Sequence, residues 1–140
     1  MSLIDEELMS DIDVARVALS NSEHSIIVVK YGKIVLTKKG GGIKPILEAI
    51  EQSKEDLQGA VVADRILGKA SALLLRYSKV KAVYSPQATK TAIALLIMGG
   101  IPCQVDELIP FIQNRSKDGM CPFEKMLKNI DSPEEAYNIL

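Results

Sequence analysis

The second half of the chain alternates short apolar segments with longer segments that suit a helix. Residues 59–66, 80–85 and 101–105 are apolar and strand-like, whereas residues 68–77 and 86–98 are long enough for helices, the latter ending at Gly-Gly. Strands that alternate with helices through short connections form parallel crossovers, which place helices against the sheet. The pattern therefore predicts an α/β fold of three layers, an α/β/α sandwich.

The first half adds a helix and a hairpin to this arrangement. Apolar residues recur at spacings of three and four over residues 4–19, which is typical of an amphipathic helix. Residues 25–30 and 33–37 are β-branched runs separated by Tyr31-Gly32, and Gly accepts the positive φ of a tight turn. We therefore expect an antiparallel pair, and with it a mixed sheet of about five strands.

The remaining segments complete a single predicted domain over residues 1–140. Pro45 suits the first turn of a helix that follows the hairpin. Residues 108–120 are expected to be irregular, and helices are expected at 122–130 and 133–140, the second with Ser132 as N-cap. No internal repeat, low-complexity tract or linker divides the chain.

Charge and composition exclude several classes of function. Lys and Arg total 17 against 18 Asp and Glu, so no basic footprint for nucleic acid is expected. The apolar run at 93–98 is far shorter than the about 20 residues of a membrane span, and the acidic start does not resemble a secretory signal, so we expect a cytoplasmic protein. One His and two Cys are a poor supply of ligands, so no metal and no cofactor is predicted.

A run of three glycines lies directly before the Pro45 helix. Glycines at a helix start leave backbone N–H groups accessible, and the helix dipole adds partial positive charge there. Gly41, Gly42 and Lys44 are therefore candidate ligands for a phosphate or carboxylate. The run matches neither a P-loop nor a dinucleotide fingerprint, and a plain strand-to-helix connection is the alternative.

Charged residues also follow the central apolar strand. Asp64 and Arg65 come at its end, and Gly68 and Lys69 begin the next helix. Ligands of open α/β sheets gather at the carboxyl ends of strands, so these four residues are candidate ligand-binding residues. Asp64 is expected to orient Lys69 or to accept a hydrogen bond from a ligand. A structural ion pair that closes the strand end is the alternative.

A third polar segment runs from Asn114 to Glu124. Asn114 and Arg115 are candidates for holding an amide or a carboxylate. Cys121 precedes Pro122 at a predicted helix start, where the dipole lowers a thiol pKa, and Glu124 falls on the first turn. An inert, buried cysteine is the alternative. The candidate catalytic residues are thus Asp64, Lys69, Cys121 and Glu124, with no reaction assigned.

The sequence resembles a small uncharacterised prokaryotic family with a cytidine-deaminase-like fold. The resemblance lies in the stretch Gly59-Ala-Val-Val-Ala-Asp-Arg-Ile-Leu-Gly-Lys-Ala-Ser, in Gly42-Ile43-x-Pro45, in Asn114-Arg115 and in Gly119-Met-Cys-Pro-Phe-Glu124. It implies a five-stranded sheet with helices on both faces and a pocket at the deaminase position. Zinc deaminases carry H-x-E and P-C-x-x-C at two helix starts, where this chain has Gly-Ile-Lys-Pro and Leu-Gly-Lys-Ala. Zinc-dependent deamination is therefore not implied.

Two hypotheses about function follow. The first is a metal-free protein that binds a nucleotide-like or phosphorylated small molecule where the three polar segments converge. The second is a non-catalytic oligomeric or regulatory module, because residues 70–75 and 92–98 are more apolar than one small sheet requires. A homo-oligomer is expected under either hypothesis.

Overall fold

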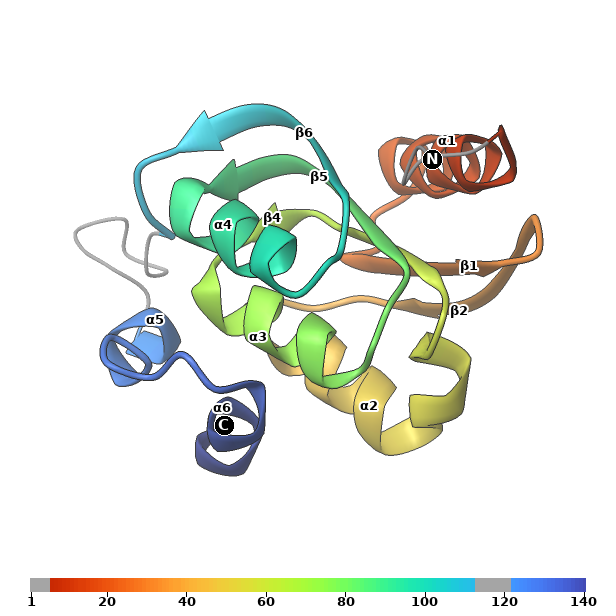
Figure 1. Ribbon diagram of the computed structural model, residues 1–140. Coiled ribbons are helices and arrows are strands. Elements are labelled where there is room, and N and C mark those ends of the chain that lie inside the picture. The colour runs from red at the N-terminus through yellow and green to blue at the C-terminus, as the bar shows by residue number, and fades with distance from the viewer. Residues whose placement is uncertain (1–5, 113–121) are drawn as a thin grey trace.

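A mixed β-sheet forms the centre of the protein. A computed structural model describes residues 6–112 and 122–140 (Figure 1). The strands are β1 (Ile26–Lys30), β2 (Lys33–Lys38), β3 (Val61–Asp64), β4 (Ile66–Leu67), β5 (Ala82–Thr89) and β6 (Cys103–Ile109). The strand order is β2-β1-β3-β5. Strands β3 and β4 both pair with one edge of β5, and β6 pairs with its other edge. The β1–β2 and β1–β3 pairs are antiparallel and the pairs of β5 are parallel, so the predicted mixed sheet is confirmed.

Helices cover both faces of the sheet, as the alternating pattern predicted. They are α1 (Glu6–Ser20), α2 (Lys44–Leu57), α3 (Lys69–Tyr77), α4 (Lys90–Met98), α5 (Pro122–Met126) and α6 (Pro133–Ile139). Successive strand residues point to opposite faces. Val61 and Ala63 of β3 accordingly pack in the core under α1, while Val62 packs in the larger core under α2, α3 and α4.

Strand β5 is longer than the sequence predicted. A helix was expected from Pro86, but β5 continues to Thr89, and Thr89 then caps α4 by accepting a hydrogen bond from the Ala92 N–H at 3.1 Å. Gln87 pairs with β4 on one edge and with β6 on the other, so sheet pairing outweighs the helical pattern of the sequence. Strand β6 likewise extends to Ile109, into the segment that was expected to be irregular.

The C-terminal helices lie against the α2 and α3 layer (Figure 1). The Tyr137 ring of α6 stacks on Tyr77 of α3 with 4.4 Å between centroids, and the Lys54 ammonium lies 4.2 Å from the Tyr77 centroid on the α2 side. Ser132 is the N-cap of α6, as predicted, because its Oγ accepts from the Glu135 N–H at 3.4 Å. Helix α5 ends at Met126, earlier than expected. Within the described residues, no helix is both long and apolar enough to cross a membrane.

Candidate functional site

Asp64 is a buried carboxyl at the end of β3. It follows Ala63, which faces α1, so its side chain turns to the α2 and α3 face, where it contacts Ser71 of α3. Only 6% of Asp64 is exposed, and its Oδ2 has no hydrogen-bond partner among the described residues. Burial raises the pKa of this carboxyl to about 7, against the lowering effect of hydrogen bonds from the Ser71 side chain and the Ile66 backbone. The carboxyl therefore keeps its proton well above the pH at which an aspartate ordinarily ionises.

The start of α3 is capped by a carboxylate from the other end of the chain. Gly68 is the N-cap and offers no side chain, and Glu124 of α5 accepts from the Lys69 N–H and the Ala70 N–H, each at 2.8 Å. A Cβ at position 68 would lie 2.3 Å from the Glu124 Oε1 and 2.6 Å from Ile112. Glycine at 68 thus makes room for the capping carboxylate, and the first N–H groups of α3 are already occupied by an anion.

Lys69 does not pair with Asp64. Its ammonium lies 2.9 Å from the Asp131 carboxylate and donates to the Lys128 carbonyl at 3.3 Å, and 12% of its side chain is exposed. Both contacts are to the segment between α5 and α6. The predicted orientation of Lys69 by Asp64 is therefore wrong, because the C-terminal segment provides closer partners.

Arg65 serves the opposite face of the sheet. Its guanidinium donates to the carbonyls of Leu19, Ser22 and His24 at 2.6 to 3.0 Å, which ties the loop between α1 and β1 to the end of β3. Arg65 therefore has a structural role. Its acceptors are backbone carbonyls, whereas the structural alternative in the sequence analysis expected an ion pair with Asp64.

The glycine loop reaches the same edge as Asp64 and Glu124. Gly40 and Gly42 adopt positive φ values of 125° and 63°, and the N-cap of α2, Ile43, makes no side-chain capping hydrogen bond. A Cβ at Gly42 would lie 3.6 Å from the Phe123 ring, so α5 packs beside the start of α2 as well as that of α3. Gly41 and Lys44 are exposed, and the Lys44 ammonium lies 3.9 Å from the Glu48 carboxylate in a loose surface pair.

The structure therefore brings together part of the predicted set. Gly42, Asp64, Gly68, the Lys69 backbone and Glu124 meet around the starts of α2 and α3, whereas Arg65 and the Lys69 ammonium point elsewhere. Asn114, Arg115 and Cys121 lie outside the described residues. The sequence analysis did not predict that Ser71 or Phe123 would lie at this edge. For Ser71 a signal was present, because its position on the helix faces the end of the strand. For Phe123 there was no such signal.

The residues present at this edge do not fit a zinc ion. Zinc is held by Cys, His and carboxylate ligands, and the described residues contain no group of three or more such side chains in reach of one another. The Glu124 carboxylate is already held by the Lys69 and Ala70 N–H groups. Among the described residues, zinc chemistry of the deaminase type therefore has no ligand set at this edge.

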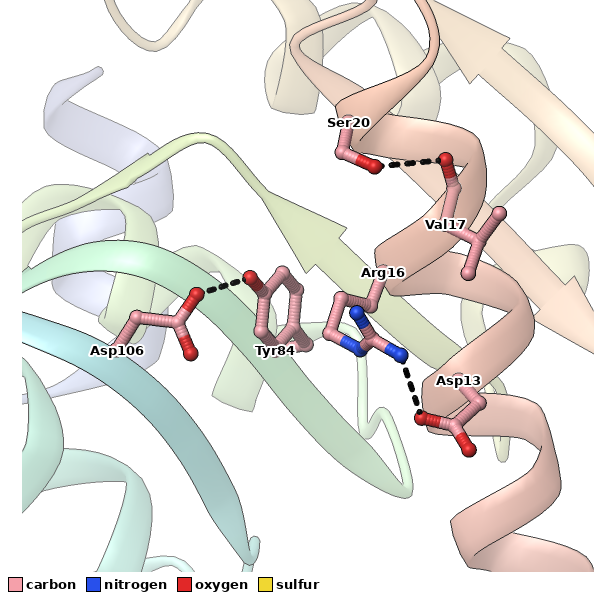
Figure 2. Close-up of polar contacts among 6 residues, drawn as sticks. All are labelled: Asp13, Arg16, Val17, Ser20, Tyr84 and Asp106. Atoms are coloured by element: carbon pink, nitrogen blue, oxygen red, sulfur yellow. Dashed lines mark hydrogen bonds and ion pairs between the residues drawn. The ribbon is translucent and has the colours of Figure 1, made fainter.

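A second polar cluster lies on the α1 face of the sheet (Figure 2). The Tyr84 hydroxyl donates to Asp106 Oδ2 at 2.5 Å, and Arg16 of α1 points toward the Tyr84 ring while pairing with Asp13 at 3.2 Å. Burial first, and Asp106 second, raise the pKa of Tyr84 to about 12. This tyrosine therefore stays a neutral hydrogen-bond donor, and the cluster joins β5 to β6 in a structural role.

The family of the chain is shown by a match over most of its length. A family model described as a domain of unknown function, DUF1893, matches residues 14–140. The chain belongs to the DUF1893 family. This confirms the resemblance to an uncharacterised family that the sequence motifs indicated. Among proteins with curated descriptions, none matches the DUF1893 chain significantly.

Solved structures confirm the fold of the DUF1893 chain. A crystal structure of a DUF1893 family protein from Thermotoga maritima is similar with a TM-score of 0.85 at 29% identity, over 97% of this chain and 89% of that one. RibD from Acinetobacter baumannii is similar with a TM-score of 0.55 at 18% identity, over 71% of this chain and 36% of that one. The second similarity shows the fold alone, and that fold is the deaminase-like one that the resemblance implied.

Proposed function

We propose that this protein binds a nucleotide-like or phosphorylated small molecule, without a metal, where β3 ends and α2 and α3 begin. The observation that carries the proposal is Asp64 Oδ2, a buried carboxyl oxygen with no partner among the described residues. Leaving such an oxygen unpaired costs about 1–3 kcal/mol, and a ligand that supplies a donor recovers that energy.

Asp64 suits a ligand that presents a hydrogen-bond donor. An amino group, a ring N–H or a hydroxyl would satisfy Oδ2, and these donors are common on nucleobases and sugars. A phosphate would be attracted instead to the start of α2, because Glu124 already occupies the N–H groups of α3. The exposed Gly41 and the uncapped Ile43 leave the α2 start accessible to an anion.

Binding at Asp64 requires a local rearrangement. Oδ2 is shielded from solvent, so the ligand reaches it only when neighbouring side chains move. Helix α5 is the element best placed to move, since it is short and its Phe123 and Met126 side chains are exposed. The capping contact of Glu124 would then be weakened on binding and restored on release.

A thermal-shift screen of nucleosides, nucleotides and phosphosugars tests this function. A ligand at about ten times its Kd stabilises the folded state by about 1.4 kcal/mol, which raises Tm by about 3–5 °C for a domain of this size. Asp64→Asn should abolish the shift, and Asp13→Asn, which changes an exposed carboxylate on α1, should leave it intact. If no compound stabilises the wild-type protein at millimolar concentration, or if Asp64→Asn retains the full shift, this function is rejected.

A non-catalytic oligomeric module is the second candidate, and it has an observation of its own. Ile97 and Met98 at the end of α4 are 63% and 75% exposed, which is unusual for large apolar side chains that adjoin each other. Asp64 is buried within one chain and is therefore not available to a partner subunit. The apolar end of α4 is the better candidate for such an interface.

A further inference from the structure

A cavity of about 580 Å³ lies at the edge of the sheet opposite Asp64. It is lined by the ends of α3 and α4, by the residues that lead into β5 and β6, and by the start of α6. Strands β3, β5 and β6 run parallel, so the residues before β5 and β6 lie at the far edge from the end of β3. This cavity is therefore separate from the candidate site described above.

Three cationic side chains line the cavity against one carboxylate. They belong to Arg76, Lys79 and Lys81, and the carboxylate is Glu134. Within the part of the chain that the structure describes, none of the three cations has an ion pair or a side-chain hydrogen bond. A local excess of two positive charges stands out in a chain whose net charge is −1.

Backbone hydrogen bonds fix the loop that carries Lys79 and Lys81. Lys79 has a φ of 59°, and the loop around it is tied to the start of β3 by a Gly59 N–H to Lys79 carbonyl bond of 2.9 Å and a Lys81 N–H to Ala60 carbonyl bond of 2.7 Å. The Arg76 side chain lies over Gly99, where a Cβ would come within 2.7 Å of Arg76 Nε. Because the loop backbone is fixed before any ligand arrives, binding does not have to order that backbone.

Helix dipoles explain only part of this charge. A cation at a helix C-terminus is stabilised by the dipole, and Arg76 lies in the last turn of α3. Lys79 and Lys81 lie beyond that helix, and the last turn of α4 carries no basic residue although it borders the same cavity. The helix dipole therefore accounts for Arg76 and not for Lys79 or Lys81.

We propose that this cavity is a second binding site, which takes the phosphate groups of a small phosphorylated metabolite. Phosphate oxygens accept charge-assisted hydrogen bonds from Lys and Arg, and Arg76 offers a planar fork that two phosphate oxygens match. The cavity volume lies in the usual range for small-molecule sites, about 300–1,000 Å³. A diphosphate is the best match, since its two groups can engage Arg76 and the lysine pair together.

Calorimetric titration with inorganic pyrophosphate tests the site. The double variant Lys79→Gln/Lys81→Gln should bind pyrophosphate at least about tenfold more weakly than the wild-type protein. The matched control Lys33→Gln/Lys90→Gln removes the same charge from exposed positions elsewhere and should change the affinity less than about twofold. Weaker binding in Lys44→Gln, at the start of α2, with unchanged binding in the double variant would place pyrophosphate at the first site and overturn this one.

Three further results would overturn the second site. They are the absence of saturable binding at about 10 mM pyrophosphate, equal weakening in both double variants, and equally tight binding of sulfate. Far-ultraviolet circular dichroism establishes that each variant is folded. If the double variant proves unfolded, Lys81→Gln alone decides the question, because Lys81 is exposed and its backbone bond to Ala60 does not depend on the side chain.

Discussion

Asp64 lies at the end of β3 against Ser71 of α3, and 6% of it is exposed. The sequence placed it at the end of a central strand, and strand polarity was enough to predict that it would lie near the starts of two helices. Its burial and its contact with Ser71 depend on how α3 packs against β3, which no local pattern encodes. The same is true of Lys69, whose partner Asp131 is 62 positions away.

Replacing Asp64 with Asn should change how stability depends on pH. In the unfolded chain the carboxyl ionises near pH 4, whereas in the folded protein it keeps its proton until about pH 7. The folded state thus binds more protons between these values, and its stability falls as pH rises from about 4 to 7. At about 1.4 kcal/mol per pKa unit, the loss above pH 7 has an upper limit of about 4 kcal/mol.

Asp64→Asn removes this titration, so the variant should gain stability relative to the wild-type protein as pH rises from 5 to about 8. Urea denaturation at a series of pH values measures the difference. Asp13→Asn serves as the control, because Asp13 is exposed and pairs with Arg16 at the surface. Parallel stability curves for the wild-type protein and Asp64→Asn would contradict the raised pKa.

Helix α3 shows that an element can depend on a distant segment for its cap. The sequence predicted its bounds closely, because Gly68 and the apolar run that follows are local signals. It gave no indication that Glu124 would supply the cap, since a glutamate on the first turn of α5 is also typical of that helix's own N-terminus. The end of β5 was missed for a related reason, because its pairing with β4 and β6 outweighs the local pattern around Pro86.

Removing the cap should destabilise α3 from its first turn. Glu124→Ala leaves the Lys69 and Ala70 N–H groups without their acceptor, and the loss should be about 1–2 kcal/mol in the free energy of unfolding. Hydrogen exchange at these two amides should also accelerate.

The control for the cap is Glu51→Ala, which removes an exposed glutamate from α2 and should cost less than about 0.5 kcal/mol. Glu124→Gln keeps one amide oxygen as an acceptor and should fall between the two. Unchanged exchange at Lys69 and Ala70 in Glu124→Ala would show that the contact does not stabilise α3.

The exposed apolar end of α4 leads to a prediction about the oligomeric state of the whole protein. If Ile97 and Met98 form an interface, light scattering at tens of micromolar should give the mass of a dimer or larger assembly, and Ile97→Ser/Met98→Ser should give a monomer. Met9→Ser, which alters an exposed apolar residue of α1, should leave the assembly intact. A monomeric wild-type protein would rule out the oligomeric function.

The cap on α3 also sets an order of events during synthesis. Glu124 and the N–H groups it binds are separated by 55 positions, so the ribosome completes α3 well before the residue that caps it. At about 5–20 residues per second, about 3–11 s pass between the synthesis of Lys69 and the synthesis of Glu124. During that time the start of α3 is open to water and to any small anion, and the polypeptide closes this end itself only when α5 emerges. A nascent chain arrested before residue 124 should therefore expose a helix terminus that the finished protein conceals.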